Sequence, residues 1–131
     1  MTDFEVAMSN APANEELALL FIRAMHRLGY GVSSSDRHLG ILCEMEPLLI
    51  EAGFSDVRSM SHMINYSYGA PLHEEWKKDF HVFAKVMESM LVETEVATSE
   101  QIQMLERQAQ VERNLQNFRG LIPMLTVWGK K

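Results

Sequence analysis

The stretch from Glu46 to Val57, EPLLIEAGFSDV, decides most of what the sequence predicts about the fold. Its first half has the apolar spacing of the last turns of an amphipathic helix. Gly53 then predicts the end of that helix, because glycine adopts the left-handed conformation of a helix C-terminus at little cost. The residues from Phe54 onward alternate in polarity and include many β-prone types. The stretch therefore predicts a junction between a helix and a strand.

Before this junction the sequence predicts two helical regions. Residues 13–28 carry a single apolar stripe at helical spacing, with acidic residues at the start and basic residues near the end, as the helix dipole prefers. Residues 40–52 predict a second helix or a pair of helices, since Pro47 is typical of a first helical turn. Residues 3–6 alternate in polarity and predict a short strand.

After the junction the sequence predicts two more strands with helices between them. A capping box formed by Thr98 and Gln101 predicts the start of one helix, which we expect Gly120 and Pro123 to end. We also expect a strand over 54–68, a long helix over 73–92 and a short final strand over 124–129.

This order predicts an α+β fold that is mostly helical, with four or five helices and a short antiparallel strand pair. A length of 131 residues fits a single domain. We expect that domain to divide into lead-in and late helices (1–53), a first strand and turn (54–72), two inserted helices (73–119) and a final strand (120–131). Because an isolated two-stranded ribbon is marginal in water, the strand pair predicts a partner for its sheet.

The composition is that of a folded globular protein, with 47% hydrophobic and 23% charged residues. The net charge of −6 argues against a nucleic-acid partner, since a phosphate backbone attracts a basic surface. No apolar stretch reaches the roughly 20 residues that cross a bilayer, and the acidic first residues lack the basic flank of a signal peptide. We therefore expect no membrane partner and a cytoplasmic location.

The sulfur-containing side chains give two further expectations. A single cysteine, Cys43, excludes an internal disulfide, and its apolar neighbours predict a buried, inert thiol. Ten methionines are a high number for this length. They fit either a loosely specified core or an apolar pocket or partner surface, because methionine adapts its shape to its surroundings.

Three segments carry a resemblance to class I S-adenosylmethionine (SAM)-dependent methyltransferases. Residues 46–57 resemble the LLxEAGFxDV segment found late in that family. Residues 126–130 resemble its last strand, and residues 3–5 resemble those that follow its fifth strand. The resemblance implies the C-terminal part of the family's Rossmann-like fold. In that family the sheet ends with an antiparallel strand pair joined by a variable insertion, so the inserted helices are expected to form a lid over the substrate.

The family's cofactor site has no counterpart among these residues. Its members hold SAM with a glycine-rich turn after the first strand and an acidic residue at the end of the second. The seven glycines here form no G-x-G-x-x-G pattern after a strand, and Gly29 and Gly31 follow a predicted helix. We therefore expect no cofactor to bind this chain alone, and the resemblance implies SAM through a SAM-binding methyltransferase subunit.

Candidate site residues gather where the expected strand runs into the inserted helices. Tyr66, Ser67 and Tyr68 leave the strand there, and we predict that they contact a small apolar or aromatic substrate. The aromatic stripe of the next helix would extend the same pocket wall with Trp76, Phe80 and Phe83. His73 and His62 are the candidate catalytic residues, as general bases, because imidazole titrates near neutral pH.

A plainer interpretation of the same residues stays open. The tyrosines can be packing residues with their hydroxyl groups at the surface, and the aromatic stripe can be the core side of a helix. His73 and His81 then mark a solvated helix face. No two histidines have the spacing of a helical metal site and H-E-x-x-H is absent, so we expect no metal ligands.

Together these observations favour an accessory or substrate-binding subunit of a split SAM-dependent small-molecule methyltransferase. It would complete the sheet and the lid of its partner in a heterodimer, and methyl transfer would belong to the complex and not to this chain alone. One alternative is a non-catalytic, methyltransferase-derived module that self-associates as a homo-oligomer and acts in binding or scaffolding. Another is a SAM-independent cyclase or isomerase that uses the lid pocket.

Overall fold

The computed structural model describes all 131 residues as an α+β fold with four helices and a small antiparallel sheet, which confirms the predicted class. The strands are β1 (Thr2–Phe4), β2 (Met8–Ser9), β3 (Ser55–Asn65) and β4 (Gly120–Lys130), and the helices are α1 (Pro12–Arg27), α2 (Ile41–Glu51), α3 (His73–Glu93) and α4 (Ser99–Arg113). The sheet is larger than a short strand pair, because β3 and β4 span 11 residues each and two short strands join them. None of the four helices has both the length and the apolar character needed to span a membrane.

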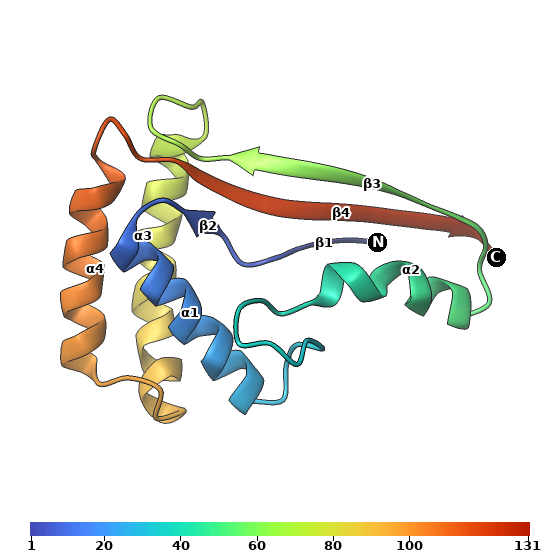
Figure 1. Cartoon of the computed structure of the whole chain (residues 1–131), viewed down its shortest axis with the longest axis horizontal. Coiled ribbons are helices and arrows are strands. Elements are labelled where there is room, and N and C mark those ends of the chain that lie inside the picture. The colour runs from blue at the N-terminus through green and yellow to red at the C-terminus, as the bar shows by residue number, and fades with distance from the viewer.

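β4 is the central strand of the sheet and runs antiparallel to all of its neighbours. β3 pairs with it along nearly its whole length, from Ser55 opposite Lys130 to Asn65 opposite Leu121. β1 and β2 lie one after the other along the opposite edge, so the N-terminal segment acts as one interrupted strand (Figure 1). Because β1 and β3 are both antiparallel to β4, they run parallel to each other.

Pro123 lies inside β4, although the sequence predicted it to end a helix and the strand to begin only at residue 124. The backbone groups of successive strand residues point to alternate sides, so residues that are an even number of positions apart point to the same side. Val127 exchanges two hydrogen bonds with Met1 in the N-terminal segment. Pro123 therefore also faces the N-terminal segment, where its carbonyl accepts a hydrogen bond from the Glu5 amide (3.0 Å). The amide hydrogen that proline lacks would point to the gap between β1 and β2. Its absence therefore removes no hydrogen bond between β4 and β3.

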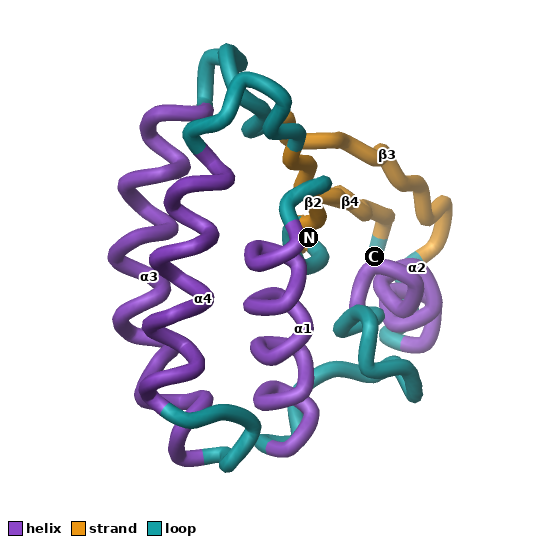
Figure 2. The backbone as a smooth tube through the Cα atoms, turned by 60° about the vertical axis from the view of Figure 1, so that its left-hand side comes forward, coloured by secondary structure: helices purple, strands orange, loops and turns teal.

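Helices α1, α3 and α4 form one packed group at one end of the sheet (Figures 1 and 2). They meet in a cluster of buried apolar side chains: Ala13, Leu17, Leu20, Ala24, Met87, Leu91, Ile102 and Ala109. Within α1 these side chains recur every three or four residues, so the helix turns one stripe to the core. α2 lies apart from this group against the β3–β4 pair, where Met45 and Val127 are both fully buried.

α2 is one continuous helix rather than a pair, and Pro47 lies inside it. Proline at this position removes a single backbone hydrogen bond, the one to the carbonyl of Cys43. Cys43 is exposed, so the prediction of a buried thiol is wrong. Successive helical residues are turned by about 100°, which places Cys43 on the side opposite to the buried Met45.

The N-terminus of α4 has the predicted capping box. The Thr98 hydroxyl accepts a hydrogen bond from the Gln101 amide (3.3 Å), and the Gln101 side chain accepts one from the Thr98 amide (2.9 Å). Both bonds satisfy backbone donors that a helix leaves unpaired in its first turn. The capping box predicted from the sequence is therefore confirmed.

The C-terminus of α4 departs from the prediction that this helix continues to Gly120. α4 ends at Arg113, and the Asn10 side chain then donates to the carbonyl of Asn117 (2.9 Å), which fixes the following turn. Phe118, predicted for the apolar stripe of the helix, is buried outside it in a second core cluster. The helix thus ends before its glycine is reached, and a contact far apart in the sequence holds the turn that follows it.

Candidate functional site

Tyr66 is the centre of a small aromatic cluster where β3 leads into α3. Its side chain is fully buried and stacks on Trp76, with 3.8 Å between the ring centroids, and Phe118 lies 5.8 Å away. The Tyr66 hydroxyl donates a hydrogen bond to the carbonyl of Met8 (2.8 Å). Burial, and then the charge of Glu15, raise the pKa of the Tyr66 phenol, so it keeps its proton at neutral pH.

Ser67 and His73 fasten this cluster to its surroundings. The Ser67 hydroxyl accepts a hydrogen bond from the Gly120 amide (3.0 Å). His73, the first residue of α3, is 3% exposed, and its Nδ1 lies 2.8 Å from the carbonyl oxygen of Tyr66. Its Nε2 is also buried and has no hydrogen-bond partner. Neither ring nitrogen is open to solvent, so the geometry favours an anchoring role for His73 at the start of α3.

Three more predicted contact residues lie beside this cluster. Phe80 packs against the guanidinium of Arg113, which lies 4.0 Å from the centroid of the ring. Phe83 is largely exposed and meets Phe21 edge-on, at 5.5 Å between centroids. Tyr68 is exposed. The structure therefore gathers most of the predicted aromatic residues, but it packs the inner ones against each other.

The histidines do not form one site. His62 lies on β3 opposite Met124 and is exposed. His73 is buried, so a solvated helix face describes His81 alone, whose side chain is 47% exposed. No group of three or more His, Cys, Asp and Glu side chains is placed to hold a metal ion.

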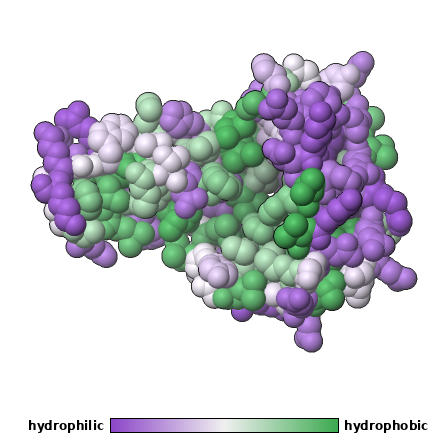
Figure 3. All heavy atoms as spheres, turned by 180° about the vertical axis from the view of Figure 1, so that it is seen from behind, coloured by the Kyte–Doolittle hydropathy of each residue, from purple (hydrophilic) through white to green (hydrophobic).

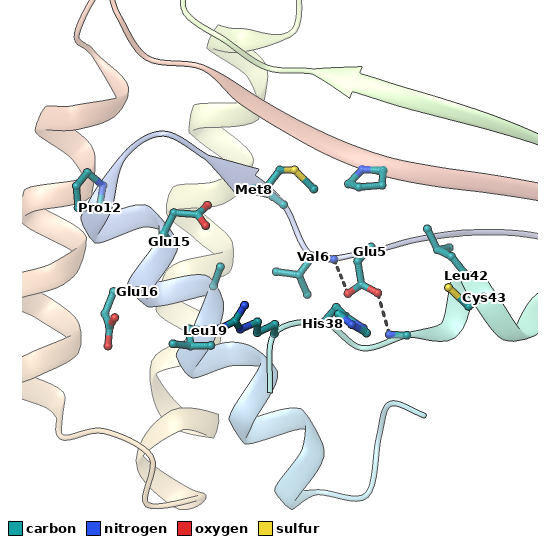
Figure 4. Close-up of a pocket in the computed structure, with 15 residues that line it drawn as sticks. Glu5, Val6, Met8, Pro12, Glu15, Glu16, Leu19, His38, Leu42 and Cys43 are labelled. Carbon is teal, nitrogen blue, oxygen red and sulfur yellow. Dashed lines mark hydrogen bonds between the residues drawn. The ribbon is translucent and has the colours of Figure 1, made fainter. Parts of the chain in front are cut away.

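A cavity of about 600 Å³ lies elsewhere in the molecule, and none of the predicted site residues lines it (Figure 4). Its walls come from the segment after β1, from α1, from the loop before α2, from α2 itself and from β4. The apolar part of the wall consists of Val6, Ala7, Met8, Pro12, Ala18, Leu19, Leu42 and Pro123. A cavity of this size and character fits a small organic molecule.

Glu5 holds two walls of this cavity together. Its carboxylate accepts hydrogen bonds from the amides of Leu39 (2.7 Å) and Gly40 (2.8 Å), and also from the amide of Val6 (3.0 Å) (Figure 4). Gly40 has a φ of +86°, and a Cβ there would lie 2.8 Å from the Cβ of Ser33. Only glycine fits this turn without strain, so it lets the loop present its amide to Glu5.

Charged side chains stand at the rim of the cavity. Glu15 and Glu16 come from α1, and Arg37 and His38 come from the loop before α2. All four are exposed. Glu15 accepts a hydrogen bond from the amide of Ser9 through one carboxylate oxygen. No hydrogen bond or ion pair engages the other three side chains, which leaves them free for a ligand.

A second, entirely polar depression of about 380 Å³ lies between α3 and α4. Its innermost residue, Arg113, is 2% exposed and donates two hydrogen bonds to Glu106 (3.1 and 2.9 Å). A third bond from Arg113 reaches Asn14 on α1 (3.1 Å). These bonds connect α4 to α1 and occupy the guanidinium donors. Arg113 therefore has a structural role in an ion pair, and the depression is not a ligand site.

The cavity residues were missed because five separate segments assemble them. The one signal that the sequence offered is Glu5, an acidic residue at the carboxyl end of an expected strand. Arg37 and His38 lie between the two predicted N-terminal helices, and no pattern singled them out.

Comparison with known proteins gives no match to this chain, whether with protein-family models, with curated proteins or with solved structures. Its function is therefore inferred from the residues and their geometry.

Proposed function

We propose that these residues form the substrate side of a SAM-dependent small-molecule methyltransferase and that a partner sheet binds SAM. The arrangement of the last two strands carries the proposal. β3 and β4 are a long antiparallel pair, and the segment between them forms the helices α3 and α4. A terminal antiparallel pair with an inserted lid is what the methyltransferase resemblance of residues 46–57 implies.

A free sheet edge gives the partner sheet a place to join. The backbone groups of Met1 and Glu5 form hydrogen bonds with β4. Because backbone groups point to alternate sides along a strand, the amides and carbonyls of Thr2 and Phe4 point away from β4. The Phe4 amide meets only the carboxylate of the neighbouring Asp3 (2.8 Å). An open edge of this kind is a template for another strand. The partner's last strand would pair along it and continue the sheet.

The position of the cavity supports the same proposal. Residues 5–8 follow β1 directly and form one cavity wall, so the cavity lies at the carboxyl end of β1. Open α/β sheets bind their ligands outside the carboxyl ends of parallel strands. A partner strand parallel to β1 would bring its own carboxyl end to the same side, next to the cavity.

The proposed contribution of this chain to the reaction is to position the methyl acceptor. SAM supplies the electrophilic methyl group when it is bound to the partner. The cavity walls would hold the acceptor in line with that group and exclude water, and orientation of this kind lowers a barrier by several kcal/mol. Glu5 would keep the loop at 37–40 in place as one of these walls.

The outward amide of Thr2 gives a sharp test. Both Thr2→Pro and Thr2→Val lose the hydroxyl contact with Thr126 (2.9 Å) and keep the backbone bonds to β4, but only Thr2→Pro also removes the outward amide. We expect the native assembly, purified through this chain, to transfer a tritiated methyl group from SAM. Thr2→Val should keep that activity and Thr2→Pro should lose about tenfold or more. Equal activity of the two variants, or no transfer by the unmodified assembly, would overturn the proposal.

Exposed apolar side chains on one face of the sheet favour a second candidate, a self-associating binding or scaffold module. Phe4, Met60 and Trp128 share that face. Paired residues point to the same face, and Thr126 pairs with both Thr2 and Met60. Residues two positions apart on a strand also share a face, which adds Phe4 beside Thr2 and Trp128 beside Thr126. Phe4, Met60 and Trp128 are 60%, 51% and 45% exposed. Figure 3 shows apolar surface along the elongated part of the molecule. Sedimentation velocity separates the candidates, since a stable dimer without methyl transfer favours the module.

A further inference from the structure

The apolar cavity between α1, α2 and the segment after β1 has the make-up of a small-molecule site. Its volume of about 600 Å³ is in the range of pockets that enclose an organic ligand. Leu19 of α1 and Leu42 of α2 line it from two helices, and Val6 lines it from the segment after β1 (Figure 4). A ligand with an apolar body therefore finds apolar contacts in several directions.

The charges around the cavity are mainly negative. Three carboxylates, those of Glu5, Glu15 and Glu16, line it together with one guanidinium, that of Arg37, and one imidazole, that of His38. Glu5 is occupied by three backbone amides, but Glu15 keeps one oxygen free and Glu16 keeps both. The net charge of −6 on the whole chain acts in the same direction. The local potential therefore favours a cation over an anion.

We propose that this cavity binds a small, mainly apolar amine in its protonated form. The apolar body would lie on Val6, Leu19 and Leu42, and the ammonium group would lie at the rim on α1, where Glu15 and Glu16 supply negative charge. Arg37 and His38 come from the loop before α2, whereas Glu15 and Glu16 come from α1.

The inference rests on the proposed function where it takes this amine as the methyl acceptor. The ammonium group first gives up a proton to solvent at the rim. The nitrogen lone pair then forms the new C–N bond while the C–S bond of SAM breaks and its electron pair stays on sulfur. The products are the N-methylammonium form of the amine and S-adenosylhomocysteine.

Three ligands of similar shape test the charge preference. Phenylethylamine, phenylethanol and phenylpropanoate would be titrated into the ¹⁵N-labelled full chain without SAM, and binding followed by amide shifts at Ala7, Leu19 and Leu42. We expect the amine to bind about fivefold more tightly than the alcohol, and the carboxylate to bind most weakly. Equal or tighter binding of phenylpropanoate, or no shift at these amides with any of the three, would overturn the inference.

A matched pair of variants tests the role of the rim carboxylates. Glu16→Gln should weaken the amine about fivefold and leave phenylethanol unchanged, since a neutral ligand gains nothing from the charge. Glu51→Gln removes an exposed carboxylate from the far end of α2, outside the cavity, and should change neither ligand. An equal effect of the two substitutions on the amine would contradict the site.

The two proposals fail in different ways. Amine binding in the cavity together with no methyl transfer by the native assembly would overturn the proposed function and leave the site standing. Methyl transfer by the assembly together with no amine binding in the cavity would overturn the site and leave the function standing.

Discussion

The ring of Tyr66 lies directly against Gly120, so closely that a Cβ on Gly120 would be 2.0 Å from Cε2 of the tyrosine. The Tyr66 amide also donates to the Gly120 carbonyl (3.0 Å). Tyr66 precedes α3 and Gly120 follows α4, so this contact joins the two ends of the inserted helices. The residue predicted as a substrate contact is thus the point that holds the inserted helices on the sheet.

Gly120→Ala should therefore destabilise the protein strongly. The new methyl group would overlap a ring that is packed on all sides, and overpacking of this kind costs about 1 to 3 kcal/mol. Gly129→Ala in the same strand is the control, because its Cβ would come no closer than 3.1 Å to any neighbour. Urea denaturation would measure both. A loss at Gly120 no larger than at Gly129 would show that the Tyr66 ring moves aside freely.

Tyr66 should also make stability depend on alkaline pH. Because the folded state raises the pKa of its phenol, the unfolded chain loses that proton first, from about pH 10. The stabilisation is complete below that pH and declines as the pH rises above it. Tyr66→Phe should cost about 1 to 2 kcal/mol at neutral pH, since it leaves the Met8 carbonyl without its donor, but should flatten the alkaline decline.

Urea midpoints at about pH 8 and about pH 11 would measure this difference. Tyr68→Phe, at an exposed tyrosine, is the control and should keep the alkaline decline of the unmodified protein. The same decline in Tyr66→Phe as in Tyr68→Phe would show that the Tyr66 phenol is not the source.

Glu5→Gln should loosen the loop before α2. The carboxylate accepts the amides of Leu39 and Gly40, and hydrogen bonds to a charged group contribute about 1.5 to 3 kcal/mol. We expect faster hydrogen exchange at those two amides with little change in the helical core. Glu44→Gln, at an exposed carboxylate in the first turn of α2, should leave both amides as they are. Unchanged exchange in Glu5→Gln would remove Glu5 as the support of this wall.

The buried ion pair between Arg113 and Glu106 gives a prediction about stability alone. Glu106→Gln leaves a 2% exposed guanidinium without its counter-charge, and breaking a buried pair costs about 3 to 5 kcal/mol. Asp56→Asn breaks the exposed pairs with Arg58 and Lys130 and should cost less than about 1 kcal/mol. Thermal unfolding would compare them, and equal losses would show that burial adds nothing here.

The local features of the fold were predictable because they depend on neighbours in the sequence. Gly53 ends α2 and the strand follows at Ser55, and the Thr98 box starts α4. The failures came where distant residues decide. From the sequence alone, Pro123 predicts the end of a helix. It fits inside a strand only because the gap between β1 and β2 lies opposite it. Asn10, from the far end of the chain, holds the turn that follows α4.

The candidate site divides in the same way. The sequence placed Tyr66, Trp76 and His73 near one another, since they follow one another along the chain, but it did not show that Tyr66 would be fully buried. Burial depends on Gly120, which lies far along the chain and leaves room for the ring. The cavity needs five segments to meet, and no local pattern contains that information.

The central claim is that SAM is held by a partner sheet beside these residues and not by residues 1–131 themselves. Ultraviolet irradiation of the native assembly with tritiated SAM, followed by digestion and mapping of the labelled peptides, tests it most directly. We predict that the label lies in peptides outside residues 1–131, in an assembly that also transfers the methyl group. Label confined to residues 1–131, or an assembly that takes up no label, would contradict the claim.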